Sequence, residues 1–150
     1  LILDMRMPGL EGSQIHARLR EQQSTLGVIV LTAHGEVDMA VEEMKRGAVD
    51  FLQKPVGGRQ LIAAIELALA RSRQRLELHQ AQQRMASLSS RAREITQLVA
   101  SGLTNREIAD RLCVAVRTVE VHRANAMRKL EIERSAELVR LWQLTETSDA

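Results

Sequence analysis

Three polar side chains follow three short aliphatic runs of the sequence, and their chemistry is complementary. The runs LIL, VIVL and VDFL are followed by Asp4, Thr32 and, two residues further on, Lys54. In a parallel α/β sheet, ligands bind outside the carboxyl ends of the strands. If the three runs are parallel strands, one acid, one hydroxyl and one cation converge at that edge. The sequence therefore predicts a ligand-binding site there.

Each of these residues also has an ordinary structural explanation. Asp4 can begin a turn, Thr32 can hydrogen-bond to nearby backbone, and Lys54 can be a solvated surface cation. Their occurrence together at three strand ends favours the functional interpretation.

The first half of the chain alternates strand-like runs with helical periodicity. The runs occupy residues 1–3, 28–31 and 49–52 and are rich in Val, Ile, Leu and Phe, as buried strands are. A short helix is predicted around Ile15 and Leu19. A second one ends at Gly47, with apolar residues at helical spacing; they are Val37, Ala40, Val41 and Met44. This βαβαβα order predicts an α/β domain whose parallel sheet is covered on both faces.

The second half has helical periodicity only. A helix that begins near Leu61 continues into a stretch rich in Arg and Gln, which is typical of a solvated linker. We therefore predict an α/β domain over residues 1–70, a helical linker over 71–87 and an all-α domain over 88–150.

Four short helices are expected in the all-α domain, because its periodicity is interrupted in three places. The breaks fall at Gly102, around Cys113 and around Ile132. Thr104 and Glu107 have the spacing of a capping box at a helix start. Cys113, as a lone free cysteine, is expected to be a small core residue.

Composition narrows the classes of partner. Residues 1–70 carry 7 Lys/Arg and 9 Asp/Glu (net −2), whereas residues 71–150 carry 14 and 10 (net +4). Aromatic residues make up 1% of the chain, which argues against base stacking on single-stranded nucleic acid and leaves duplex DNA or protein as partners. The sequence has no apolar run of membrane length and no secretory leader, so we expect a cytoplasmic chain without a membrane partner.

The segment GLTNREIADRLCVAVRTVEVHRANAMRKL has the pattern of a helix-turn-helix. Ile108, Ala109 and Leu112 supply the core face of its first helix. On the second helix one stripe is predicted to face the core; it consists of Val119, His122, Ala126 and Leu130. The opposite face is within reach of a major groove and consists of Arg117, Glu120, Val121, Ala124 and Arg128. A helical bundle with a charged solvent face is the alternative.

Over residues 1–57, DMRMPG and LTAHGEVDMAVEEMKRGAVDFLQKP are similar to the second half of a response-regulator receiver domain of the FixJ branch, a flavodoxin-like fold. The resemblance implies that Asp4 accepts a phosphoryl group from the phosphohistidine of a sensor histidine kinase. It also implies that Mg²⁺ takes Asp4 and the backbone carbonyl of Arg6 among its ligands. Lys54 is then expected to pair with the phosphoryl group, and Thr32 to hydrogen-bond to it.

The same resemblance implies a switch. Phe51 occupies the position of the family's switch aromatic and is expected to move toward Thr32, with a simple core role as the alternative. The Lys54-Pro55 bond is expected to be cis. The helix that ends at Gly47 and the strand after it are expected to pair with a second copy of the chain.

In this family two further strands, two helices and the acidic pair that completes the metal site precede the acceptor strand. The sequence begins at that strand, at Leu1, so we expect an incomplete receiver with an exposed apolar sheet edge. Mg²⁺ then has too few carboxylates, and phosphorylation of the chain as written is doubtful.

RTVEVHRANAMRKL is similar to the recognition helix of the LuxR-type DNA-binding domain, and the resemblance covers about residues 88–141. It implies double-stranded DNA as a partner, with base contacts from Glu120, Val121 and Ala124. Contacts to bases or phosphates are implied for Arg117, Thr118, Arg123 and Arg128, and a phosphate site at a helix N-terminus for Thr104, Asn105 and Arg106. His122 is expected to be a packed core residue. The dimer contact is expected from the last helix, through Ala136, Leu138, Val139 and Leu141.

Three positions depart from the LuxR-type pattern. Ala92 replaces a Glu that closes a capping box with Ser89. Cys113 replaces a turn glycine, and Ala115 replaces a Ser or Thr cap. Together the last two are expected to cost about 1–2 kcal/mol.

The leading hypothesis is therefore a non-enzymatic transcription regulator of a two-component system, which dimerises on DNA when Asp4 is phosphorylated. Within the FixJ branch, DMRMPGLEG, AVEEMKRGAVDFLQKPV and AVRTVEVHRA are most similar to regulators of tetrathionate respiration. Two alternatives remain: a constitutive DNA binder whose receiver part is inactive, and a phosphorelay or docking module that does not bind DNA.

Overall fold

The structure is a computed structural model, and it describes residues 1–9, 11–33 and 37–146. The motif residues 34–36 and the last four residues of the predicted helical domain lie outside this description, as does the side chain of Val37. The chain divides into two compact units, Leu1–Leu76 and Glu77–Ala150. The predicted linker over 71–87 stays a prediction.

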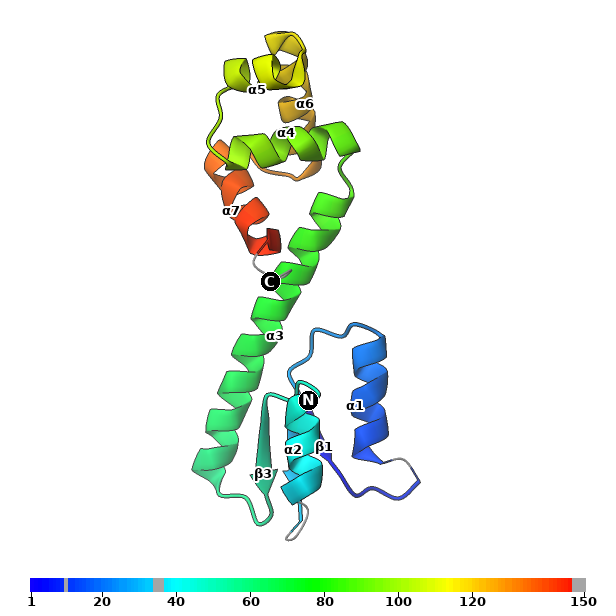
Figure 1. Ribbon diagram of the computed structural model, residues 1–150. Helices are drawn as coiled ribbons and strands as arrows, with labels where there is room; N and C mark the ends of the chain where they lie inside the picture. The colour runs from blue at the N-terminus through cyan, green and yellow to red at the C-terminus, as the bar shows by residue number, and fades with distance from the viewer. Residues whose placement is uncertain (10, 34–36, 147–150) are drawn as a thin grey trace. The chain divides into compact units, whose positions relative to one another are not determined.

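The first unit contains a three-stranded parallel sheet in the order β1-β2-β3; Figure 1 labels β1 and β3 together with helices α1 and α2. Its elements alternate along the chain as strand and helix, as predicted; they are β1 (Ile2–Asp4), α1 (Gly12–Glu21), β2 (Ile29–Thr32), α2 (Val37–Lys45), β3 (Asp50–Gln53) and the start of α3 (Gly58–Ala86). Asp4 pairs with Leu31 in the register, and Leu31 with Leu52. The three strands therefore end at one edge.

Both faces of the sheet are covered, as a parallel sheet requires. Successive residues of β2 alternate between faces: Val30 belongs to a core that α1 closes with Ile15 and Leu19. Ile29 packs with Ala64 and Ala68 of α3 on the other face. The α/β class is thus confirmed, and the cores place α1 and α3 on opposite sides of the sheet.

The inward face of α2 differs from the predicted one. Ala40 and Glu43 are almost fully buried, whereas Val41 and Met44 are exposed.

 Of the predicted apolar set, Ala40 is confirmed as inward-facing; Glu43 was missed because apolar periodicity counts a charged residue as outward-facing. Glu43 is accommodated because it finds a polar partner on α1, as described below. The predicted end of the helix is confirmed, since Gly47 adopts a positive φ of 99° just after it.

The second unit contains helices and no strand over its described residues 77–146, as predicted. It contains the end of α3 and four shorter helices; they are α4 (Ser90–Ala100), α5 (Asn105–Leu112), α6 (Val116–Lys129) and α7 (Ser135–Glu146). Their single core includes residues that are less than 1% exposed, among them Ile95, Ile108, Val119, Leu130 and Leu138. The predicted stripe of α6 is confirmed for its apolar members, and His122 is half-buried at its edge.

The caps of these helices follow the predictions. Thr104 and Glu107 form the complete capping box of α5. The Ser89 hydroxyl accepts from the Ala92 amide at the start of α4, and Ala115 makes no side-chain cap at the start of α6.

The expectation that Cys113 is a core residue was wrong, because its side chain is exposed. It ends α5 in the left-handed region at φ 52°. Glycine adopts this conformation without steric cost and cysteine does not. The departure from the family's turn glycine is therefore a site of backbone strain.

In the part of the chain that the structure describes, no helix combines the length and the apolar character that crossing a bilayer requires.

Candidate functional site

The edge at which the three strands end brings Asp4 and Lys54 together. Lys54, 50 residues further along the chain, donates from its Nζ to Asp4 Oδ2. The backbone amide of Arg6 donates to Asp4 Oδ1 at 3.1 Å. The carboxylate is thus held on both oxygens, and it remains partly accessible, with 31% of its side chain exposed.

These contacts keep the carboxylate ionised. The hydrogen bond from Lys54 and the bond from the Arg6 amide hold the pKa of Asp4 below its usual range, and the charge of Lys54 acts in the same direction. At neutral pH Asp4 is therefore an accessible anion, which is the form of a carboxylate that acts as a nucleophile.

Thr32 and Lys54 are joined through the backbone. The Lys54 amide donates to the Thr32 carbonyl at 2.9 Å, and the Thr32 side chain is buried. Phe51 is 37% exposed on β3, which excludes the simple core role for its side chain in this structure. The Lys54-Pro55 bond is cis, as expected.

The backbone of α1 approaches the acceptor very closely. A Cβ atom on Gly12 would lie 2.4 Å from the Asp4 carbonyl oxygen and 3.0 Å from the Met5 Cα. The Gly12 amide also donates to the Met5 carbonyl at 3.3 Å. Glycine at this position therefore allows α1 to begin directly against the end of β1.

A magnesium ion does not find a sufficient set of ligands among the described residues. They contain no group of three His, Cys, Asp or Glu side chains arranged to hold a metal ion. At the strand ends, Asp4 is already paired with Lys54, and the Arg6 carbonyl adds one neutral oxygen. Mg²⁺ keeps several waters in its octahedral shell, but the acidic pair that the resemblance implies beside Asp4 is not found among the described residues.

One face of α6 is open to solvent along its length. It consists of the predicted residues Arg117, Glu120, Val121, Ala124 and Arg128, all of them exposed. Their polar contacts are local: Arg117 Nη1 lies 3.3 Å from Glu120 Oε2, and Arg128 Nη2 donates to Asn125 Oδ1 at 2.8 Å. Exposed pairs of this kind are weak, so both arginines can turn toward a ligand.

Arg123 differs from these arginines because it is half-buried between three helices. Its Nη1 donates to Asn105 Oδ1, at the start of α5, at 2.8 Å, and its Nη2 donates to the Ser135 hydroxyl at the start of α7. The structure therefore gives Arg123 and Asn105 an internal role in addition to the DNA role predicted for them. The sequence pattern did not identify Ser135. The sequence places Ser135 at the start of a helix, and nothing in it indicates a contact with Arg123.

The N-terminus of α5 already carries a negative charge. Thr104 donates from its amide and from its hydroxyl to Glu107 Oε2, each at 2.7 Å, and these bonds lower the pKa of Glu107. Two first-turn amides, those of Asn105 and Arg106, have no acceptor within the helix. A phosphate at this end therefore has to approach beside a carboxylate.

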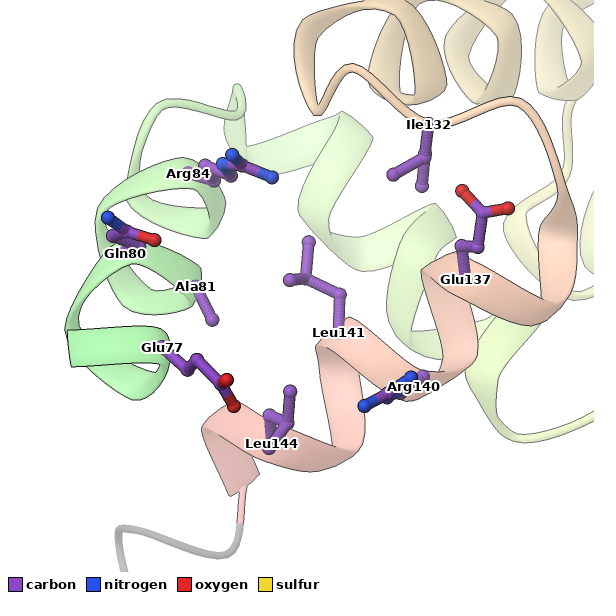
Figure 2. Close-up of a pocket in the computed structure, with 9 residues that line it drawn as sticks. All are labelled: Glu77, Gln80, Ala81, Arg84, Ile132, Glu137, Arg140, Leu141 and Leu144. Atoms are coloured by element: carbon purple, nitrogen blue, oxygen red, sulfur yellow. The ribbon is translucent and has the colours of Figure 1, made fainter. Parts of the chain in front are cut away.

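The predicted dimer contact of α7 needs one correction. Leu138 is fully buried in the core, so it cannot contact a second copy directly. Leu141 is half-buried and Leu144 is exposed; they flank a pocket of about 300 Å³ beside the last turns of α3. Figure 2 shows Leu141 pointing into the space between the two helices, with Ala81 on the opposite wall.

Two family models match separate stretches of the chain. Residues 1–66 match the model of the response regulator receiver domain, and residues 86–142 match that of the bacterial regulatory proteins of the luxR family. The chain is 50% identical over 143 residues to the tetrathionate response regulatory protein TtrR of Salmonella typhimurium, covering 95% of this chain and 69% of the relative. The chain belongs to the response regulators.

Other relatives support the same placement of this response regulator. It is 41% identical over 145 residues to the transcriptional regulatory protein FixJ of Bradyrhizobium diazoefficiens, covering 94% of this chain and 71% of the relative. Among solved structures it is similar to the response regulator StyR, with a TM-score of 0.61 and 39% identity over 95% of this chain and 74% of that one. The protein is a DNA-binding response regulator of the FixJ type, with a receiver part and a LuxR-type helix-turn-helix.

Proposed function

We propose that Asp4 is the phosphoryl acceptor of this response regulator. The observation that carries the proposal is an accessible, ionised carboxylate at a strand end, held by a lysine from another strand end. A carboxylate oxygen of Asp4 attacks the phosphorus of a phosphohistidine on a sensor histidine kinase. The new O–P bond replaces the N–P bond, and the bonding electrons return to the imidazole nitrogen.

Lys54 then has two successive partners. Before transfer its ammonium neutralises the Asp4 carboxylate, and after transfer it pairs with the phosphoryl oxygens that the carboxylate has acquired. The same cation therefore stabilises both states and favours the one with more negative charge. Receiver domains generally use Mg²⁺ for this transfer. No step is assigned to Mg²⁺ in this chain, because the described residues do not provide its ligands.

Thr32 and Phe51 are proposed to report the transfer. The Thr32 hydroxyl hydrogen-bonds to the phosphoryl group, and its movement frees space that Phe51 enters from its exposed position. Val41 and Met44 on α2 are exposed and are proposed to contact a second copy of the chain. Burying their apolar surface favours the dimer.

The output is proposed to be duplex DNA recognition by α6 in the cytoplasm. Glu120, Val121 and Ala124 face the base edges, and Arg117 and Arg128 contact bases or phosphates on either side of them. The half-buried Thr118 lies at the margin of this surface, and Thr104 and Arg106 are proposed to approach a phosphate from α5. A dimer places two such helices on half-sites about one helical turn apart.

Phosphoryl uptake tests the acceptor. The chain is incubated with a small-molecule phosphodonor, with and without Mg²⁺, and its intact mass is measured beside an Asp4→Asn variant. We expect one phosphoryl group on the parent and none on the variant. A Glu11→Gln variant, which removes an exposed acid near the same edge, serves as the control and should behave as the parent.

The alternative of constitutive DNA binding is distinguished by the same experiment. A folded parent that gains no mass but binds DNA would overturn the acceptor role of Asp4 in this chain. A docking module that does not bind DNA is disfavoured by the LuxR-type domain and by the exposed arginines of α6.

A further inference from the structure

The first unit contains a fully buried polar pair that joins α1 to α2. His16 of α1 contacts Glu43 Oε2 through its Nδ1, and the two residues are 3% and 2% exposed. The other carboxylate oxygen, Oε1, accepts from Arg46 Nη1 at 2.8 Å. Ionisable groups are rarely so buried unless they are paired, and the loss of one partner leaves the other unsatisfied.

This pair replaces the apolar contact that helical periodicity predicts. Glu43 lies on the inward face of α2, while the apolar side chains of Val41 and Met44 face solvent. The two helices are therefore joined by a directional contact between His16 and Glu43, and Ala40 is a buried apolar residue of α2. Directional contacts are made or broken, whereas apolar packing can shift by small steps.

The pair is also close in the chain to the acceptor. His16 is four residues, about one helical turn, after Gly12, whose backbone abuts the Asp4 carbonyl. A pocket of about 340 Å³ lies between the end of β1 and α2; it is lined by Met5, Ser13, Glu43 and Arg46 among others. A shift of α1 at its first turn would reach His16 within one helical turn, and the pocket leaves space beside α2.

We infer that His16 and Glu43 are positioning residues that transmit phosphorylation of Asp4 to α2. This route is separate from the one through Thr32 and Phe51, because it passes through α1 and not through the ends of β2 and β3. The inference rests on the proposed phosphorylation of Asp4. It assigns to a buried His–Glu contact the coupling between the acceptor and the helix that presents Val41 and Met44 to a second copy.

Hydrogen exchange of α2 tests the coupling. Exchange of the peptide that covers residues 37–45 is measured by mass spectrometry in the full chain, with and without phosphodonor, beside intact mass. In the parent we expect phosphorylation to change this exchange. In Glu43→Gln the phosphoryl uptake should equal that of the parent, but the phosphorylation-dependent change in exchange should fall at least threefold. A purely structural role would raise exchange equally in both states and preserve the difference.

Glu42→Gln is the matched control. Glu42 is the adjacent carboxylate on the same helix, but it is exposed and pairs with exposed Lys45 at 2.8 Å. Its substitution should leave both uptake and the exchange difference unchanged. If Glu43→Gln is too unstable to fold, the double variant His16→Leu/Glu43→Leu replaces the pair by apolar contact, which buried pairs generally tolerate. It should also lose the exchange difference.

The outcomes separate the two proposals. A parent that takes up no phosphoryl group fails in the mass measurement and overturns both the acceptor role and the coupling that rests on it. If the parent and the folded His16 and Glu43 variants all take up phosphate and show the same change in α2, the acceptor role stands and the coupling is overturned.

Discussion

The two functional regions of this response regulator are assembled in opposite ways. At the acceptor, Asp4 and Lys54 come from strand ends 50 residues apart, and Gly12 closes the edge from a helix. On α6, the polar contacts of the exposed face join residues three apart on the same helix, as in Arg117 with Glu120.

This difference separates what each region needs in order to exist. The acceptor site requires the assembled sheet, because no single element contains its parts. The recognition surface requires only that α6 is helical and is held on its core, and the side chains of its outer face add little to stability. Substitutions should therefore affect stability and function together at the acceptor, and separately on α6.

The largest expected effect concerns the hydrophobic core of the DNA-binding unit. Leu138→Ala removes a fully buried side chain and should lower the free energy of unfolding by about 2–5 kcal/mol. Urea unfolding followed by fluorescence of Trp142, the one tryptophan of the chain, measures it, because Trp142 lies in the same core. Leu144→Ala, on the exposed side of α7, should cost no more than about 0.5 kcal/mol. Equal losses for the two variants would contradict the assignment of Leu138 to the core and of Leu144 to the surface.

Arg123 and Arg117 sharpen the comparison within α6. Arg123→Ala breaks two charge-assisted hydrogen bonds and should destabilise this unit by about 1–3 kcal/mol. Its DNA affinity should fall without a change in salt dependence. Arg117→Ala should leave stability within about 0.5 kcal/mol and, if Arg117 contacts a phosphate, reduce the slope of log affinity against log salt by about 1. DNA titrations at several salt concentrations measure both slopes. A reduced slope in Arg123→Ala would indicate that Arg123 contacts a phosphate in addition to its internal partners.

Gly12→Ala is the corresponding test at the acceptor. The added Cβ meets backbone atoms, so we expect a loss of about 1–3 kcal/mol in the first unit together with reduced phosphoryl uptake. Circular dichroism detects the unfolding of the whole chain, whereas Trp142 fluorescence follows the second unit and should be unchanged. Gly57→Ala, where no atom lies within 4 Å of the new Cβ, is the control. If Gly12→Ala took up as much phosphoryl group as the parent, the close approach of α1 to Asp4 would not matter for the acceptor.

The smallest expected effect is on the cap of α5. Because the pKa of Glu107 is lowered in the folded state, its contribution to stability is present above its unfolded pKa and is lost as pH falls through its folded pKa. Glu107→Gln should therefore be less stable than the parent at neutral pH, and the difference should shrink below about pH 4. Thr104→Ala should cost about 1 kcal/mol at neutral pH. Trp142 fluorescence in urea at pH 7 and pH 3 measures these changes. If the stability difference between the parent and Glu107→Gln grew on acidification, the predicted direction of the pH dependence would be wrong.

Much of the fold could be predicted from local signals. Aliphatic runs mark the three strands, and the Thr104–Glu107 box and the glycines at 47 and 102 mark helix ends, because these signals depend on near neighbours in the chain. The convergence of Asp4 and Lys54 was also predictable, since parallel strands end at one edge.

The features that were missed depend on partners distant in the sequence. Periodicity assigned Val41 to the inward face of α2, because it cannot detect that Glu43 finds His16, 27 residues earlier. The DNA role of Arg123 stays a prediction from its position on the helix, but its internal bonds to Asn105 and Ser135 were missed because packing brings these residues together. Cys113 was assigned to the core by residue type, and the left-handed turn instead directs its side chain to solvent.

The central claim is that the state of Asp4 controls DNA recognition by α6. The most direct measurement is the affinity of the chain, at one fixed salt concentration, for duplexes selected by the chain itself from a random library. It is made with and without phosphodonor, for the parent and for Asp4→Asn. We expect phosphodonor to tighten binding by the parent at least tenfold and to leave Asp4→Asn unchanged. Equal affinity of the phosphorylated and unphosphorylated parent would contradict the claim and would indicate a constitutive DNA binder.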